Sequence, residues 1–142
     1  MVETGVDLIN QGSYGCIFRP GLNCKGKTMN KKYITKVQKS ANTSQKETKL
    51  GKKIKTIENY DDYFAPILKT CEISMARMSD EKVKKCDFIE DDGKTYETNK
   101  LRYVGKNTLA KHILNVTEEN PKRLFRVLLD THKNILIGFK KL

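Results

Sequence analysis

The sequence lacks long apolar runs. No stretch approaches the roughly 18 to 20 consecutive apolar residues that a membrane-spanning helix requires. Residues 1–5 contain no basic segment followed by an apolar one, so the N-terminus does not carry the pattern of a secretion signal. We therefore expect a protein that neither enters a membrane nor is secreted, with a cytoplasmic location.

Ligands for metal ions are also sparse. The chain has only two histidines, His112 and His132, and its four cysteines are far apart, with no C-x-x-C pair. Zinc sites usually place such ligands at short, regular spacing, so no metal site is expected. In a cytosolic setting the cysteines are predicted to be reduced thiols that mostly act as small apolar fillers. They are Cys16, Cys24, Cys71 and Cys86.

Motifs for nucleic-acid binding are absent as well, although the chain is basic. Its 28 lysine and arginine residues exceed its 17 acidic residues and give a formal net charge of +11. The lysines are spread over almost every segment, and no basic run is interleaved with aromatic residues. This distribution favours a solvated basic surface, so nucleic acid is expected to bind only non-specifically.

The remaining composition is that of a soluble globular domain. Of the 142 residues, 37% are apolar and 32% are charged, which suffices for one sizeable core. Residues 5–18 are predicted to form a strand, a turn and a second strand, and residues 32–38 a third strand. N-cap residues at 40–44 then predict a helix that ends near Asn59. Its apolar positions are Leu50, Ile54 and Ile57.

The second half of the chain is more polar. Residues 64–77 contain an apolar segment that predicts a fourth strand. Residues 79–99, with the turn signal Asp91-Asp92-Gly93, are predicted to form a polar excursion or a hairpin between strands. Residues 101–105 are predicted to be a last strand that ends at a glycine. Leu109 is expected to open a short helix.

A long amphipathic helix is predicted from Pro121. Asp130, His132 and Asn134 are expected on its solvated face. The apolar positions are Leu124, Phe125, Leu128, Leu129, Ile135, Leu136 and Phe139.

The most informative segment is residues 9–18, which read INQGSYGCIF. A hairpin with small residues at its tip lets backbone N–H groups approach a phosphate chain. The segment resembles the Gly-rich loop of the protein-kinase family, G-x-G-x-x-G-x-V. Gly12, Gly15 and Ile17 fall on its second glycine, third glycine and valine, and Asn10 stands where the first glycine belongs.

Lys36, within the strand pattern YITKV, resembles the third-strand lysine of the same family, V-A-I-K. Ile34 occupies the place of the alanine that lies against adenine. The resemblance implies that Glu47, on the predicted helix, pairs with Lys36 and orients it toward the phosphates. The alternative is a surface carboxylate that pairs with Lys46 or Lys49. The loop and the cysteine shortly after it look most like serine/threonine kinases of large DNA viruses.

The resemblance implies an α+β fold: residues 1–105 as a kinase N-lobe, with a twisted antiparallel sheet, an αC-type helix and a hinge, and residues 106–142 as the helical start of a C-lobe. Lys36 and Glu47 would be the catalytic residues of this part. Leu101 would lie near the gatekeeper position. The residues expected to bind ATP are Asn10, Gly12, Ser13, Tyr14, Gly15, Ile17, Ile34, Lys36, Arg102, Tyr103 and Val104.

The motifs that complete a kinase, H-R-D-x-x-x-x-N and D-F-G, do not occur in these residues. We therefore expect the ATP-binding part of a serine/threonine-type kinase that is inactive alone, because the groups that hold Mg²⁺ are missing. Its apolar C-terminal helix is expected to promote self-association. The alternative is a non-catalytic, pseudokinase-like module that binds a protein partner or nucleic acid.

Overall fold

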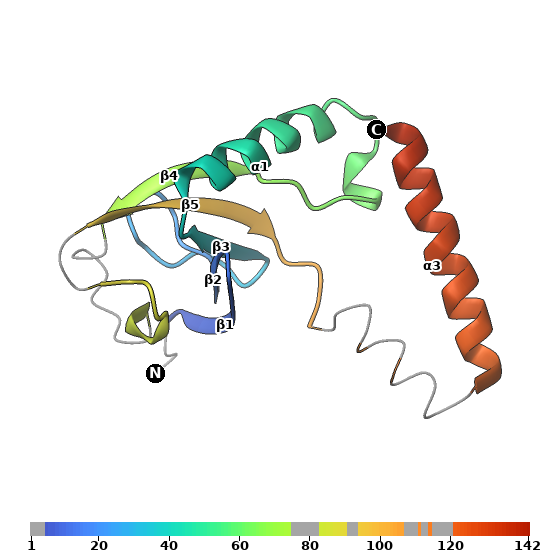
Figure 1. Ribbon diagram of the computed structural model, residues 1–142, viewed down its shortest axis with the longest axis horizontal. Coiled ribbons are helices and arrows are strands. Elements are labelled where there is room, and N and C mark those ends of the chain that lie inside the picture. The colour runs from blue at the N-terminus through green and yellow to red at the C-terminus, as the bar shows by residue number, and fades with distance from the viewer. Residues whose placement is uncertain (1–4, 75–82, 91–93, 107–110, 112–113, 115–120) are drawn as a thin grey trace. The chain divides into compact units, whose positions relative to one another are not determined.

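The computed structural model describes residues 5–74, 83–90, 94–106, 111, 114 and 121–142 (Figure 1). The chain divides into two compact units. The first contains Met1–Lys55 and Ala65–Tyr103, and the second contains Thr56–Phe64 and Val104–Leu142. We describe each unit by itself.

The first unit is built on a five-stranded antiparallel sheet with the strand order β1-β2-β3-β5-β4. The strands are β1 (Asp7–Gly12), β2 (Gly15–Arg19), β3 (Tyr33–Gln38), β4 (Lys69–Ser74) and β5 (Thr95–Arg102). Helix α1 (Ala41–Ile54) packs against β3 and β5 (Figure 1). The predicted α+β class with an antiparallel sheet is therefore confirmed.

Different parts of the chain pack against the two faces of the sheet. Side chains that are directly opposite each other in a ladder share a face. Lys36 is opposite Ile17 and Asn99, and these residues lie on the face that carries α1, which we call the α1 face. Residues of the other face, the core face, contribute to the main apolar core. Its buried members are Val6, Cys16, Phe18, Leu22, Val37, Ile73, Val83 and Cys86.

Two connections cover the core face. The loop between β2 and β3 is held by Thr35: the Leu22 N–H donates to its Oγ1 at 2.6 Å, and that hydroxyl donates to the Leu22 carbonyl at 3.2 Å. Residues 83–89, which include the 3-10 helix η3 (Val83–Lys85), pack against the hairpin of β1 and β2. The Gln11 side chain also hydrogen-bonds Asp87 in this segment.

The cysteines differ from the prediction of four reduced thiols. Cys16 in β2 is bonded to Cys86, and Cys24 in the β2–β3 loop is bonded to Cys71 in β4. The Cα atoms of the two pairs are 6.1 and 5.4 Å apart, within the usual range for a disulfide. The partners are separated by 70 and 47 residues, so only the fold of the core face brings them together.

Helix α1 ends at Ile54, earlier than predicted, and its packing face matches the prediction at Ile54 but not at Leu50. Ser44, Gly51 and Ile54 are buried, whereas Leu50 is 53% exposed. A Cβ on Gly51 would lie 3.2 Å from the backbone nitrogen of Ile67. The helix therefore approaches the segment at Ile67 through its small residues. The spacing of large apolar residues does not indicate such a face.

The fifth strand begins at Thr95, six positions before the predicted start at residue 101. Its sequence, TYETNKLR, is largely polar, and the buried residues Thr98 and Asn99 hydrogen-bond within the fold. Polar residues that are hydrogen-bonded internally give no apolar signal, so the sequence pattern placed them in an excursion or hairpin between strands. The predicted turn at residues 91–93 lies outside the described residues.

The second unit contains η1 (Tyr60–Asp62) and α3 (Pro121–Lys141), so the predicted helix from Pro121 is confirmed. Gly138 of α3 packs against Phe64, and the Lys141 ammonium lies 4.7 Å from the centroid of the Tyr63 ring. The predicted solvated residues Asp130, His132 and Asn134 are exposed. The short helix predicted at Leu109 lies outside the described residues. Within the described part of the chain, no helix has the length and apolar character needed to cross a membrane.

Candidate functional site

The hairpin of β1 and β2 forms one edge of the candidate site. Gly12 and Gly15 are paired across the turn, and Ser13 and Tyr14 form its exposed tip. The Lys39 N–H donates to the Tyr14 carbonyl at 3.1 Å, which anchors the tip to the end of β3. A Cβ on Gly12 would have no heavy atom within 4 Å, so the space beside this glycine is open.

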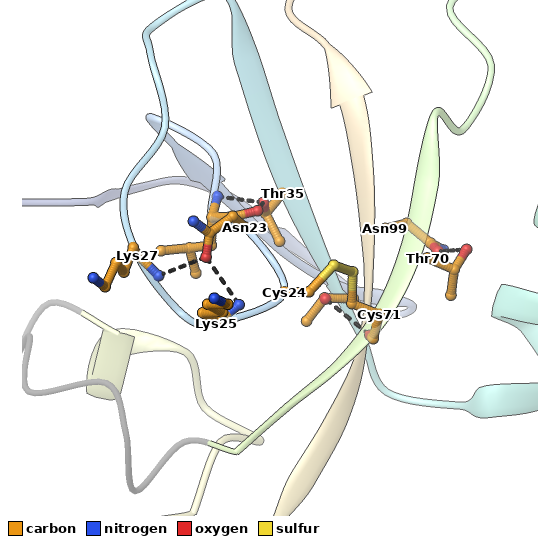
Figure 2. Close-up of a disulfide and its surroundings, with 10 residues drawn as sticks. Asn23, Cys24, Lys25, Lys27, Thr35, Thr70, Cys71 and Asn99 are labelled. Atoms are coloured by element: carbon orange, nitrogen blue, oxygen red, sulfur yellow. Dashed lines mark hydrogen bonds between the residues drawn. A yellow bond between two sulfur atoms is a disulfide. The ribbon is translucent and has the colours of Figure 1, made fainter.

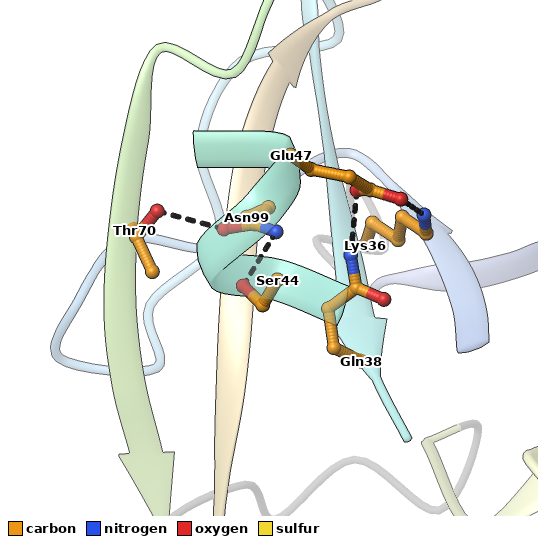
Figure 3. Close-up of polar contacts among 6 residues, drawn as sticks. All are labelled: Lys36, Gln38, Ser44, Glu47, Thr70 and Asn99. Carbon is orange, nitrogen blue, oxygen red and sulfur yellow. Dashed lines mark hydrogen bonds and ion pairs between the residues drawn. The ribbon is translucent and has the colours of Figure 1, made fainter. Parts of the chain in front are cut away.

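Lys36 and Glu47 form the polar centre of the site (Figure 3). The Lys36 ammonium donates to Glu47 Oε1 at 2.6 Å, and the two side chains are 20% and 36% exposed. The contact predicted from the sequence is therefore present. It spans only 11 positions because β3 ends at Gln38 and α1 already begins at Ala41.

Gln38 also contacts this ion pair, which sequence reasoning missed. Its Nε2 donates to Glu47 Oε2 at 2.7 Å, so each oxygen of the carboxylate accepts one hydrogen bond (Figure 3). The other amide atom, Gln38 Oε1, is buried without a hydrogen-bond partner in the described structure. The strand alternation that puts Lys36 and Gln38 on one face was the signal that could have found it.

Asn99 connects the same region of α1 to the sheet, and sequence reasoning missed it too. Its Nδ2 donates to Ser44 Oγ at 2.8 Å, and its Oδ1 accepts from Thr70 Oγ1 at 2.8 Å (Figure 3). Thr70 also shares a 2.8 Å hydrogen bond with Thr48 of α1. Asn99 and Ser44 are fully buried, so this network fixes the helix next to Glu47.

The rest of the α1 face near the hairpin is apolar. Ile17 is opposite Lys36, and Ile34 is opposite Leu101, so the three apolar side chains share the face of the lysine. All three are only partly buried. Asn10 is opposite Ile17 at the exposed edge of the same face. The arrangement is a partly open apolar surface with an ammonium group and an exposed hairpin tip beside it.

The segment predicted to face adenine with its backbone, residues 102–104, lies at the end of β5 and directly after it. Arg102 is opposite Tyr33 and therefore lies on the core face. The Tyr103 N–H donates to the Lys32 carbonyl at 2.9 Å, and the Arg19 guanidinium lies 3.7 Å from the centroid of the Tyr103 ring. Val104 belongs to the second unit and is 77% exposed.

No group of three or more histidine, cysteine or acidic side chains that could hold a metal ion occurs among the described residues. The chain matches no protein-family model, and neither the curated proteins nor the solved structures give a match. The site must therefore be interpreted from its own geometry.

Proposed function

We propose that this chain is the N-terminal, ATP-binding part of a serine/threonine-type protein kinase, of the kind found in large DNA viruses. The observation that carries the proposal is the 2.6 Å contact between Lys36 and Glu47 on the sheet face beside the hairpin of β1 and β2. In this reading residues 1–105 are a kinase N-lobe, α1 is its αC-type helix, and residues 106–142 are the start of the C-lobe.

In the proposed role, ATP lies along the α1 face with its phosphates beneath the hairpin tip. Lys36 has three N–H donors, of which Glu47 uses one, so two can bond phosphate oxygens. Glu47 keeps the ammonium in place, and Gln38 fixes the second carboxylate oxygen. Ile17, Ile34 and Leu101 offer an apolar surface for the base.

Phosphoryl transfer to a protein hydroxyl would occur only in the complete enzyme. The transfer needs Mg²⁺ to neutralise phosphate charge and an aspartate to orient the attacking hydroxyl. The H-R-D and D-F-G motifs that supply these groups are absent from the sequence. The chain alone should therefore bind ATP weakly and transfer nothing.

The second candidate is a non-catalytic, pseudokinase-like module that binds a protein partner. The observation that favours it is the hinge segment: the Tyr103 N–H is already used by Lys32, and Arg19 covers the Tyr103 ring. Ile34 also takes space that adenine needs in the resembling family. The basic surface would attract nucleic acid only non-specifically.

ATP titration separates the two candidates. A fluorescent ATP analogue should bind to the wild-type chain, and Lys36→Met should lower the affinity by about tenfold or more, because a charge-assisted hydrogen bond is lost. Glu47→Gln should lower it less, and the double variant should not be additive. Lys39→Met, which removes an exposed charge near the hairpin, is the matched control and should bind like the wild type. Equal affinities for all these proteins would refute the ATP site.

The chemistry is tested on the protein completed with its downstream sequence. Radiolabelled ATP transfer should be lost in Lys36→Met while the melting temperature stays near the parental value. A well-folded Lys36→Met protein that phosphorylates at the parental rate would remove the kinase assignment of this lysine. A completed protein that binds a partner but transfers no phosphate would favour the non-catalytic module.

The compartment belongs to the proposal as well. We propose a cytoplasmic location, either in the host cell or within the virion. Disulfides are typical of oxidising compartments. The redox state of the four cysteines in the cell therefore tests the proposed cytoplasmic location. Thiol alkylation before lysis, followed by mass spectrometry, would measure it.

A further inference from the structure

A cavity lies on the core face of the first unit, at the disulfide between Cys24 and Cys71. Figure 2 shows this disulfide and the residues around it. The volume of the cavity is about 280 Å³, slightly below the about 300–1,000 Å³ typical of pockets for drug-sized ligands. The β2–β3 loop forms one wall, and strands β4 and β5 form the other. Such a volume suits a small ligand or one side chain of a partner.

Three lysines from three different elements line this cavity: Lys25 from the loop, Lys69 from β4 and Lys100 from β5. Lys69 and Lys100 are directly opposite each other in the ladder, an arrangement of like charges that destabilises a sheet. The Lys100 ammonium lies 3.9 Å from the centroid of the Tyr33 ring, which holds it in place. The opposition of Lys69 and Lys100 therefore costs stability, and a bound anion would relieve that cost.

The described structure supplies no such anion. No carboxylate among the described residues pairs with Lys25, Lys69 or Lys100. Asn23 also lines the cavity, and its Oδ1 already accepts from the N–H groups of Lys25 and Lys27 at 2.9 and 3.0 Å (Figure 2). The polar side chains of the lining are thus three lysines and one asparagine whose oxygen is occupied.

We propose that this cavity binds a phosphomonoester. A phosphate group presents three acceptor oxygens and nearly two negative charges, which matches three ammonium groups better than a single carboxylate does. Leu22, Met29 and the disulfide form an apolar wall that can contact the organic part of the ester. The ester can belong to a free metabolite or to a phosphorylated side chain of a protein.

NMR titration of the ¹⁵N-labelled chain tests the assignment. Phenyl phosphate should shift the resonances of the cavity residues, and Lys69→Gln and Lys100→Gln should each weaken binding by about tenfold. Lys25 lies in an exposed loop, so Lys25→Gln still tests the site if one of the strand variants fails to fold. Lys27→Gln removes a charge from the same loop outside the cavity, so it should change the affinity by less than about twofold.

Further probes identify the source of the ester, and some of their results would refute the proposed site. A phosphothreonine peptide that binds more tightly than phenyl phosphate indicates a protein ligand, and the reverse order indicates a metabolite. The site is refuted if Lys69→Gln/Lys100→Gln binds like the wild type, or if benzoate or an oligonucleotide without a terminal phosphate binds equally well. Lys36→Met should leave the phenyl phosphate shifts of the cavity residues unchanged, so this site and the proposed ATP site can fail separately.

Discussion

The carbonyl oxygen of Val37 occupies the space that a Cβ on Gly15 would need. Gly15 therefore lets β2 approach β3 closely, and its φ of +157° lies at the edge of the range that side chains rarely adopt. Gly12, its partner across the turn, has open space instead. The two glycines of the hairpin thus have different roles, one in packing and one at the open surface.

Gly15→Ala should destabilise the protein by about 1–3 kcal/mol, because the added methyl group forces the strands apart. Gly12→Ala should change the free energy of unfolding by less than about 0.5 kcal/mol, as expected for an exposed site without packing neighbours. If the proposed ATP site is correct, Gly12→Ala should still weaken ATP binding, since the methyl group enters the space kept for phosphate. Urea unfolding and ATP titration of both variants measure the difference. Similar stability losses in the two variants would contradict these roles.

Asn99→Ala should lower the free energy of unfolding by about 2–3 kcal/mol, because it removes two buried hydrogen bonds and leaves the Ser44 hydroxyl without this donor. Gln45→Ala, on the exposed side of α1, is the control and should have little effect. Chemical denaturation of both proteins provides the measurement. A double-mutant cycle with Ser44→Ala should give a positive coupling energy, and strict additivity would argue against the network.

Reduction of the disulfides should lower the stability of the first unit by about 2–4 kcal/mol for each bridge, since both close long loops of the unfolded chain. Thiol titration of the folded protein should find no free cysteine before a reductant is added. The Cys24→Ser/Cys71→Ser variant should retain the stabilisation from the bridge between Cys16 and Cys86. Four titratable thiols in the folded protein before any reductant is added would contradict the pairing.

Helix α3 should promote self-association. Its exposed apolar side chains, 42% to 67% accessible, are Leu128, Leu129, Ile135, Leu136 and Phe139. Contiguous apolar patches beyond a few hundred Å² are unusual on monomers, so a second copy is expected to cover this face. Light scattering over a range of concentrations should detect the association, and Leu136→Lys/Phe139→Lys should reduce it. Asn134→Lys adds a charge at an exposed polar position of the same helix and should not reduce the association. A monomer at every concentration would contradict the prediction.

The sequence by itself determined the features that depend on residues close together in the chain. Small residues at the hairpin tip, alternation around Lys36 and the apolar spacing after Pro121 each predicted an element that the structure contains. Glu47 was selected because the resemblance to the kinase family implies an acid on the helix that pairs with the lysine, and the two groups do meet. The strands and the helix themselves depend on residues close together in the sequence, so periodicity and turn chemistry suffice to find them.

Tertiary structure alone decided the contacts between distant segments. The disulfide partners, the opposition of Lys69 and Lys100, and the burial of Asn99 all follow from the strand order β1-β2-β3-β5-β4. The burial of Gly51 in place of Leu50 likewise reflects how closely α1 approaches Ile67. A sequence pattern shows how apolar and polar residues are spaced. Packing and hydrogen bonds between distant segments decide which face of an element contacts which other element.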